Sequence, residues 1–325
     1  MAQQHSSAAP GALSGKIVTL VGGSGFFGRH VAQELLARGA RLRIASRNPQ
    51  RAFAIRPLGN LGQVQFSRAD VTRPAGLAAA FAGADAVVNL VGAFAGDLDA
   101  VQGAGAGRIA AAAAAAGAQA FVHVSANGAD ADSPVDYART KAEGEAAVRA
   151  AFPGATILRP SILFGADDAF VNMFGRLIAS LPALPVFAPD ARIQPVLVDD
   201  AAVAVANALA DPASHGGRTY VLAGPEAMTM LDFNRRIAAA QGRERWLIEL
   251  PDFVSEAIAT LTGWAPGAPI TRDQWQLLRA GNVADPALPG IGALGVAPRP
   301  LGLFLDKWMV RFRKHGRFGR KARVG

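Results

Sequence analysis

The sequence predicts an α/β fold: a doubly wound, parallel Rossmann sheet, a smaller C-terminal lobe and a basic amphipathic C-terminal tail. Two observations carry this prediction. Short apolar runs typical of buried strands alternate with segments whose apolar residues recur at helical spacing. A glycine-rich turn joins the first of these strands to the first helix, as in a nucleotide-binding β-α-β unit.

The first strand and the first helix are expected on either side of this turn. Residues 17–21 form an apolar, β-branched run, and strand-type sequence resumes at 41–45. Gly22 permits a tight turn, Gly25 lets a pyrophosphate approach the backbone, and Gly28 lets the helix pack closely on the strand. The N–H groups at the helix start then hold the phosphates. The predicted cradle is Gly22, Gly23, Ser24, Gly25, Phe26, Phe27 and Gly28.

The composition limits the chemistry that this chain can perform. It has 325 residues, 51% of them hydrophobic, so we expect a globular protein with a large core. It contains no cysteine, which excludes disulfides and thiolate metal sites, and we predict no metal centre. Any redox role therefore requires a bound cofactor. We expect no signal peptide and no membrane span.

The positive charge is concentrated at the C-terminal end. The net charge is +8, and eight of the 33 Lys and Arg residues lie from Lys307 onward, where no acidic residue occurs. The remaining 25 basic residues equal the 25 Asp and Glu residues in number. The body of the protein is therefore neutral, and the tail carries the excess.

The end of the second predicted strand favours NADP(H) over NAD(H). In NAD-specific folds an acidic residue about 20 residues after the glycines binds the ribose. No acidic residue occurs here between Leu35 and Asp70, whereas Ser46 and Arg47 end the strand. Ser46 can donate a hydrogen bond, and Arg47 can bind a 2′-phosphate through its guanidinium fork. The alternative is that Arg47 is a solvated loop charge.

Further strands are expected over 64–66, 85–92 and 120–125, with helices over 74–81 and 99–117 between them. The predicted cofactor contacts at the strand ends are Asp70 and Val71, which related folds place near adenine, and Asn89, Val91 and Gly92, where the backbone approaches the cofactor. His123 lies within an apolar strand and is predicted to be a packed side chain rather than a catalyst.

Tyr137 and Lys141 are the predicted catalytic pair. They are four residues apart in a helical segment, so they share one face. An ammonium beside a phenol lowers the pKa of the phenol, and it can also bond the nicotinamide ribose. Tyr137 is one of only two tyrosines.

Together these residues resemble the extended or atypical short-chain dehydrogenase/reductase family, with further matches at 158–160 and 164–165. The resemblance implies NADP(H) across the strand ends, a contact at Pro160 and Tyr137 as proton donor. The family's third catalytic hydroxyl follows the fifth strand, where Ser125 precedes Ala126 and Asn127. Either Ser125 serves, or the chain binds nucleotide without turnover.

Two later segments resemble a narrower group, the NADPH-binding accessory subunits of respiratory complex I. They are residues 164–174, with a Gly, Asp, Phe, Asn, Phe arrangement, and residues 270–278. An alternative for the first is an ordinary helix start capped by Asp168. Beyond it we expect a strand over 193–198 and a helix over 201–210 that Asp199 and Asp200 cap rather than bind metal.

The C-terminal tail is predicted to be an interfacial helix. Its apolar face would contain Leu301, Phe304, Leu305, Trp308 and Phe312, flanked by Lys307, Arg311 and Lys314. A Trp-bearing stripe beside basic residues suits an anionic membrane surface. The alternatives are an acidic protein partner, nucleic acid bound through phosphate charge, and a disordered end. Nucleic acid is the least favoured, because no aromatic RNA-binding platform is recognisable.

These interpretations combine into one functional prediction. The segments are a disordered arm over 1–15, an NADP(H)-binding Rossmann domain over 16–165, a lobe over 166–300 with elements returning to that domain, and the tail over 301–325. The resemblance implies an NADPH-binding accessory subunit of bacterial NADH:quinone oxidoreductase, with other subunits as partners, on the cytoplasmic side of the inner membrane. The alternatives are an active NADP(H)-dependent reductase or epimerase on a small or quinone-related substrate, and an RNA-binding relative.

Overall fold

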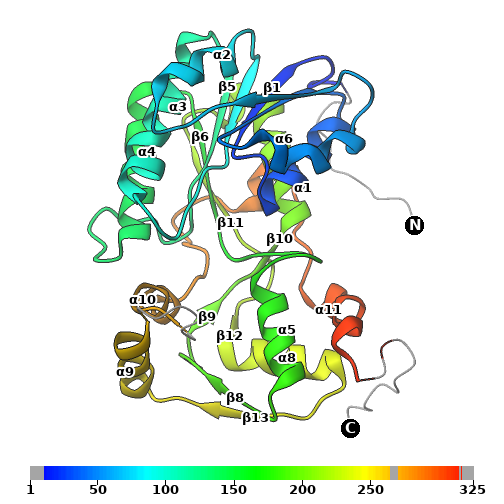
Figure 1. The fold of residues 1–325 in the computed structure, drawn as a ribbon, viewed down its shortest axis with the longest axis vertical. Coiled ribbons are helices and arrows are strands. Elements are labelled where there is room, and N and C mark those ends of the chain that lie inside the picture. Colours follow the sequence, from blue (N-terminus) through cyan, green and yellow to red (C-terminus); the bar gives the residue numbers. More distant parts are fainter. Residues whose placement is uncertain (1–10, 264–269, 315, 317–325) are drawn as a thin grey trace. The chain divides into compact units, whose positions relative to one another are not determined.

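The computed structural model describes residues 11–263, 270–314 and 316. The chain divides into two compact units (Figure 1). The first unit comprises Met1–Pro160, Val198–Leu222 and Ala284–Ala297. The second unit comprises Ser161–Leu197, Ala223–Val283 and Pro298–Gly325.

A seven-stranded parallel sheet forms the centre of the first unit, in the order β11-β6-β5-β4-β1-β2-β3. The predicted doubly wound Rossmann sheet is therefore confirmed. The strand order reverses between β1 and β4, and ligands of such sheets bind beyond the carboxyl ends of the strands at that point. The strands are β1 (Ile17–Val21), β2 (Arg41–Ser46), β3 (Val64–Arg68), β4 (Ala86–Asn89), β5 (Ala120–Val124), β6 (Thr156–Pro160) and β11 (Thr219–Leu222).

Helices cover both faces of this sheet. In Figure 1, α1 and α6 lie on one side of the strands and α3 and α4 on the other, and the members of each pair contact each other. The helices are α1 (Phe26–Ala37), α2 (Leu77–Phe81), α3 (Ala104–Ala115), α4 (Asp136–Ala151), α6 (Val198–Ala210) and α7 (Pro212–His215). Short 3-10 segments cover Pro49–Leu58, Pro74–Gly76 and Ile291–Leu294, and a π-turn covers Asp99–Gly103.

The contact between α4 and the π-turn depends on the smallest side chain. A Cβ on Gly144 of α4 would lie 2.2 Å from the carbonyl oxygen of Gln102. Glycine therefore allows the two segments to approach closely, and this approach fixes the start of α3 beside α4.

The second unit combines helices with three two-stranded sheets, which pair β10 with β7, β12 with β9 and β13 with β8. Its helices are α5 (Phe170–Ser180), α8 (Met230–Gln241), α9 (Asp252–Thr262), α10 (Arg272–Ala280) and α11 (Gly302–Trp308). Its strands are β7 (Leu163–Phe164), β8 (Ala183–Val186), β9 (Arg192–Ile193), β10 (Val196–Leu197), β12 (Met228–Thr229) and β13 (Trp246–Glu249). Asp168 accepts from the backbone N of Val171 at 2.6 Å, so it caps the start of α5.

The strand predicted over 193–198 is wrong as a single element. It is interrupted after Ile193, and β9 and β10 pair in different sheets. Pro195 has no N–H to donate and lies between the two short strands. Helix α6 begins at Val198, earlier than predicted, so Asp199 and Asp200 lie in its first turn, where the helix dipole favours negative charge.

The apolar face of the tail lies inside the second unit rather than on its surface. Leu301, Leu305 and Met309 are only 2%, 4% and 0% exposed, and Phe304, Trp308 and Phe312 pack against the same core. The prediction of a free interfacial helix is therefore wrong for 301–312, because these side chains complete the lobe's core. His315 and residues 317–325, with most of the remaining tail charge, lie outside the described residues.

None of the helices in the described part of the chain is both long and apolar enough to span a membrane.

Candidate functional site

The glycine turn between β1 and α1 has the close backbone packing and the open helix start that fit an anion. Gly22 has a φ of +80°, and a Cβ there would lie 3.2 Å from the backbone of Leu90. A Cβ on Gly28 would lie 2.5 Å from the carbonyl oxygen of Gly23, so only glycine lets α1 start this close to the turn. Gly25 is exposed, its Cβ would meet nothing nearer than 3.7 Å, and α1 has no side-chain cap. The turn therefore fits a pyrophosphate.

The ends of β2 and β3 carry the features predicted for a ribose phosphate. The hydroxyl of Ser46 is buried and has no hydrogen-bond partner among the described residues. Arg47 is exposed beside it. The pKa of Asp70 is lowered, first by hydrogen bonds from Thr72 and then by the charges of Arg47 and Arg73. The unpartnered hydroxyl of Ser46 and the positive charge at this end of the sheet fit an anionic ribose.

The side chain of Asn89 is buried and makes polar contacts within the first unit. It is 1% exposed, its amide nitrogen lies 3.0 Å from Nδ1 of His123, and its Oδ1 accepts from the backbone N of Val91 at 3.0 Å. Its side chain thus shapes the turn after β4. Burial lowers the pKa of His123 to about 3, so this imidazole stays neutral and is a packed side chain, as predicted.

The other predicted cofactor residues lie at or just beyond the carboxyl ends of the same sheet: Val71 after β3, Val91 and Gly92 after β4, and Pro160 at the end of β6. Ser24, Phe26 and Phe27 lie in the glycine turn and at the start of α1. Parallel strands bring their carboxyl ends to one edge, so these residues share that edge with the glycine turn.

Tyr137 and Lys141 both lie on α4, but the ammonium is directed at the backbone. Lys141 is 3% exposed, and its Nζ donates to the carbonyl oxygens of Val91 at 3.2 Å and Val124 at 3.3 Å. Burial lowers the pKa of Lys141 to about 8. The amine therefore ties the ends of β4 and β5 to α4.

The environment of Tyr137 is the reverse of the predicted one. Its ring is half-buried and stacks on Phe94, with 4.5 Å between ring centroids and 13° between ring planes. Burial raises the pKa of Tyr137 to about 12. The prediction that Lys141 lowers this pKa is wrong, because burial disfavours the phenolate and the Lys141 ammonium donates to two backbone carbonyls instead.

Ser125 retains an available hydroxyl. It is 3% exposed, and its Oγ has no hydrogen-bond partner among the described residues. It follows Val124, whose carbonyl accepts from Lys141, so the three residues predicted for catalysis belong to neighbouring elements of the first unit.

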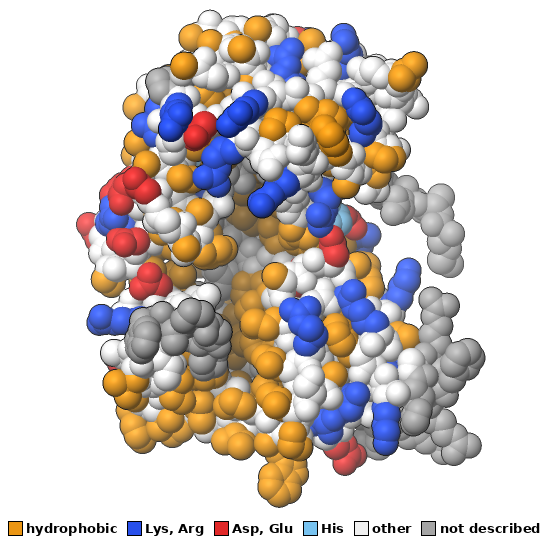
Figure 2. Space-filling view, in the orientation of Figure 1, with side chains coloured by type: hydrophobic (Ala, Val, Ile, Leu, Met, Phe, Trp, Pro, Cys, Tyr) orange, Lys and Arg blue, Asp and Glu red, His pale blue; other side chains and the backbone are white. Residues whose placement is uncertain are grey.

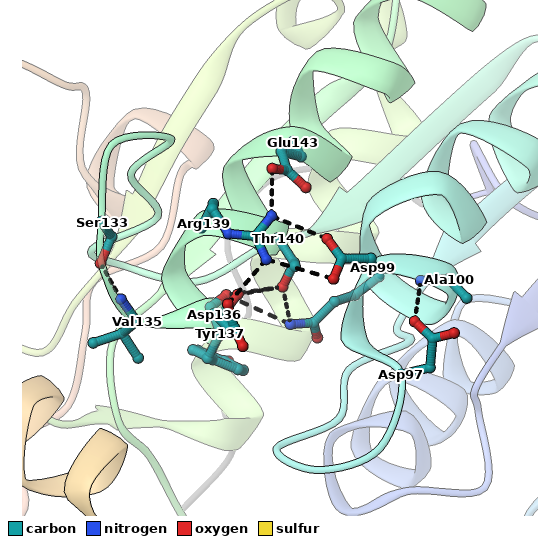
Figure 3. Close-up of polar contacts among 11 residues, drawn as sticks. Asp97, Asp99, Ala100, Ser133, Val135, Asp136, Tyr137, Arg139, Thr140 and Glu143 are labelled. Atoms are coloured by element: carbon teal, nitrogen blue, oxygen red, sulfur yellow. Dashed lines mark hydrogen bonds and ion pairs between the residues drawn. The ribbon is translucent and has the colours of Figure 1, made fainter.

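Sequence reasoning missed the polar network that holds this region (Figure 3). Gln102 accepts from the backbone N of Ala93 at 3.2 Å and donates to Thr140 at 2.8 Å. Arg139 binds Asp99 of the π-turn at 3.0 Å, and its other two partners are on α4 itself. These contacts fix the loop after β4 and the π-turn against α4.

Part of this network could have been predicted from the spacing of charged residues in the sequence. Asp136 and Glu143 lie three residues before and four residues after Arg139, which are helical pairing distances. The pairing with the three carboxylates raises the pKa of Arg139 and lowers that of Asp99. Figure 2 shows acidic side chains gathered over the α4 side of the first unit. Gln102 had no such signal, because its partners are remote in sequence.

Comparison with known proteins identifies the family. Residues 22–172 match a family described as NAD(P)H-binding. Over 92% of its length the chain is 32% identical to the rat mitochondrial NADH dehydrogenase [ubiquinone] 1 alpha subcomplex subunit 9, of which it covers 81%. The chain belongs to this NAD(P)H-binding family. The cofactor prediction is confirmed at this level.

Two other proteins show the breadth of this NAD(P)H-binding family and its fold. The chain is 31% identical to a ceramide reductase of Caulobacter vibrioides, over 73% of its own length and 74% of that protein. The structure of Citrobacter triphenylmethane reductase in complex with NADP(H) matches with a TM-score of 0.73 at 20% identity, covering 90% of this chain and 99% of the reductase. The second match concerns the fold alone.

Proposed function

We propose that this chain is an NADPH-holding accessory subunit of a bacterial NADH:quinone oxidoreductase, in the peripheral arm on the cytoplasmic side of the membrane. The observation that carries the proposal is the likeness to a mitochondrial NADH dehydrogenase subunit, which spans both units of this chain. A likeness of this extent includes the second unit, which lies largely outside the nucleotide-binding match.

In this proposal, the nucleotide is NADPH. The start of α1 and Gly25 would hold the pyrophosphate, and Ser46 and Arg47 the 2′-phosphate. The backbone after β4 and Lys141 would lie toward the nicotinamide end. When bound, NADPH supplies a hydride donor. In a subunit that only holds it, the bound nucleotide stabilises the native state, since it binds that state alone.

The condition of Tyr137 supports holding rather than turnover. A proton donor works best when its pKa lies near the working pH, and here burial raises the pKa of the phenol to about 12. Lys141 is bound to carbonyl oxygens, and Ala126 and Asn127 replace the later hydroxyl positions after β5.

The second candidate is an active NADP(H)-dependent reductase or epimerase on a small or quinone-related substrate. It is favoured by the unpartnered Ser125 hydroxyl near α4 and by the likeness to a ceramide reductase. Here Tyr137 would donate the proton to the substrate oxygen, and Ser125 would orient that oxygen.

The partners in the leading proposal are other subunits of the oxidoreductase and the anionic membrane surface. An exposed apolar surface of the second unit supports a protein partner: Trp246, Phe253 and Leu261 are 79%, 75% and 73% exposed. Figure 2 shows hydrophobic side chains along this edge, over β13 and α9. Lys307 and Lys314 are exposed basic residues that suit an anionic surface.

Purification of the tagged protein from membranes in mild detergent tests the proposal. We expect it to co-migrate with the respiratory complex in stoichiometric amount, and the Tyr137→Phe variant to do the same. A protein that migrates alone and oxidises NADPH with a carbonyl substrate, with turnover lost in Tyr137→Phe, would establish the reductase instead.

A further inference from the structure

The loop after β4 places an exposed aromatic side chain directly on Tyr137. Phe94 is 73% exposed, and its ring lies nearly parallel to that of Tyr137 at 4.5 Å. Exposure of a phenylalanine is unfavourable, because most of its apolar surface remains in water. One face of this ring is nevertheless used to cover a predicted catalytic side chain.

The loop that carries Phe94 is anchored to the helix that carries Tyr137. The backbone N of Ala93 donates to Gln102, which is 1% exposed and donates in turn to Thr140 of α4. At the other end of the loop, the backbone N of Ala100 donates to Asp97 at 2.9 Å (Figure 3). The backbone next to Phe94 is therefore linked to α4 through the buried side chain of Gln102, which supports the stack of Phe94 on Tyr137.

We propose that Phe94 is a specificity-determining residue that covers one face of the Tyr137 ring and keeps small carbonyl compounds from that face. This inference rests on the proposed function, because a subunit that holds NADPH must prevent its oxidation by carbonyl compounds that reach the site. A carbonyl reduced at this site requires a proton for its oxygen, and Tyr137 is the predicted donor. Partial burial of the ring favours the neutral phenol, in agreement with the raised pKa of Tyr137.

Nitration of tyrosine by tetranitromethane tests the cover without any substrate. The reagent attacks accessible phenolate, and the absence of cysteine removes its competing reaction with thiols. The chain has two tyrosines, and Tyr220, 2% exposed, is an internal reference in the same molecule. Peptide mass spectrometry at mildly alkaline pH, with and without NADP, reports each site separately.

Truncation of the cover is expected to expose Tyr137 selectively. In Phe94→Ala, nitration at Tyr137 should rise about tenfold relative to Tyr220, as for a fall of one unit in the phenol pKa. Phe94→Trp retains an aromatic cover and should behave as the wild type. Phe253→Ala removes an equally exposed ring, 75% exposed, from the second unit and should change neither site. Equal nitration of Tyr137 in the wild type and Phe94→Ala would overturn the proposal.

A second measurement separates this inference from the proposed function. NADPH oxidation with phenanthrenequinone, which takes up two electrons and two protons to become the hydroquinone, should be slow in the wild type and faster in Phe94→Ala. Fast wild-type turnover that Tyr137→Phe abolishes would remove the proposed function. The cover fails with it if Phe94→Ala does not raise that turnover further, and it stands if turnover and nitration at Tyr137 both rise in Phe94→Ala.

Discussion

Arg47 is the residue on which we propose that nucleotide choice depends, because the end of β2 has no carboxylate to bind ribose hydroxyls. Its neighbour Ser46 offers a buried, unpartnered hydroxyl. Both groups suit a 2′-phosphate, which NADPH has and NADH lacks.

Arg47→Ala should therefore weaken NADPH binding by about 10- to 100-fold, the value of a charge-assisted hydrogen bond, and leave NADH binding nearly unchanged. Calorimetric titration with both nucleotides measures this. Arg41→Ala removes an exposed guanidinium at the opposite end of β2 and serves as the control. An equal loss for both nucleotides would contradict the assignment.

Lys141 links the site to pH. Its pKa is about 8 in the folded protein, against an ordinary value of 10.5, because burial disfavours the ammonium. Between these two pH values the unfolded chain binds more protons than the folded one, so the free energy of unfolding rises with pH across this window. Tyr137 opposes the effect above its ordinary pKa of 10.0, so the clear range runs from about pH 8 to 10.

Urea unfolding of the wild type over that range should show stability rising with a slope of up to about 1.4 kcal/mol per pH unit. Lys141→Met should lose this contribution, whereas Lys307→Met, which removes an exposed lysine, should keep it. An identical pH dependence in all three proteins would show that Lys141 is not desolvated.

At the scale of elements, two glycines of the turn between β1 and α1 have different predicted roles, one in folding and one in nucleotide binding. A Cβ on Gly28 would lie 2.5 Å from backbone, whereas a Cβ on Gly25 would meet nothing nearer than 3.7 Å. Gly28 is therefore needed for α1 to pack, whereas Gly25 is the glycine at which we propose that a ligand approaches.

Gly28→Ala should destabilise the apo protein by about 1 to 3 kcal/mol, because backbone must move to admit the methyl group. Gly25→Ala should unfold like the wild type in the absence of nucleotide but bind NADPH more weakly. Thermal unfolding with and without NADPH distinguishes the two. If Gly25→Ala binds NADPH as tightly as the wild type, the pyrophosphate does not lie at this turn.

At the scale of the whole molecule, the C-terminal segment is part of a core. Leu305 and Met309 are buried in the second unit, and Arg313 donates to the carbonyl of Ala240 at the end of α8. In the proposal, the charge of this segment reaches a partner through exposed residues such as Lys307 and Lys314 rather than through its apolar face.

Deleting residues 317–325 should therefore leave thermal unfolding unchanged and weaken salt-sensitive binding to anionic vesicles. Deleting residues 302–325 should unfold the second unit, since each buried Leu or Met contributes about 2 to 5 kcal/mol. Limited proteolysis and calorimetry follow both changes. A stable protein after the longer deletion would show that the segment is dispensable to the core.

The sequence by itself determined the features that depend on short-range patterns. The alternation of strands and helices and the glycine turn follow from local periodicity and backbone requirements. The position of Arg47 at the end of β2 could also be predicted, because it is found by counting residues from the glycine turn. These features concern neighbours along the chain, for which spacing is sufficient information.

Tertiary structure decided what each side chain contacts. The partners of Lys141 are carbonyls 50 and 17 residues away, and the ring that covers Tyr137 comes from another loop. The same holds for the tail, whose apolar stripe is equally consistent with a membrane and with a core until its partners are known. Burial and pKa depend on the full surroundings of a group in space, and no local pattern contains them.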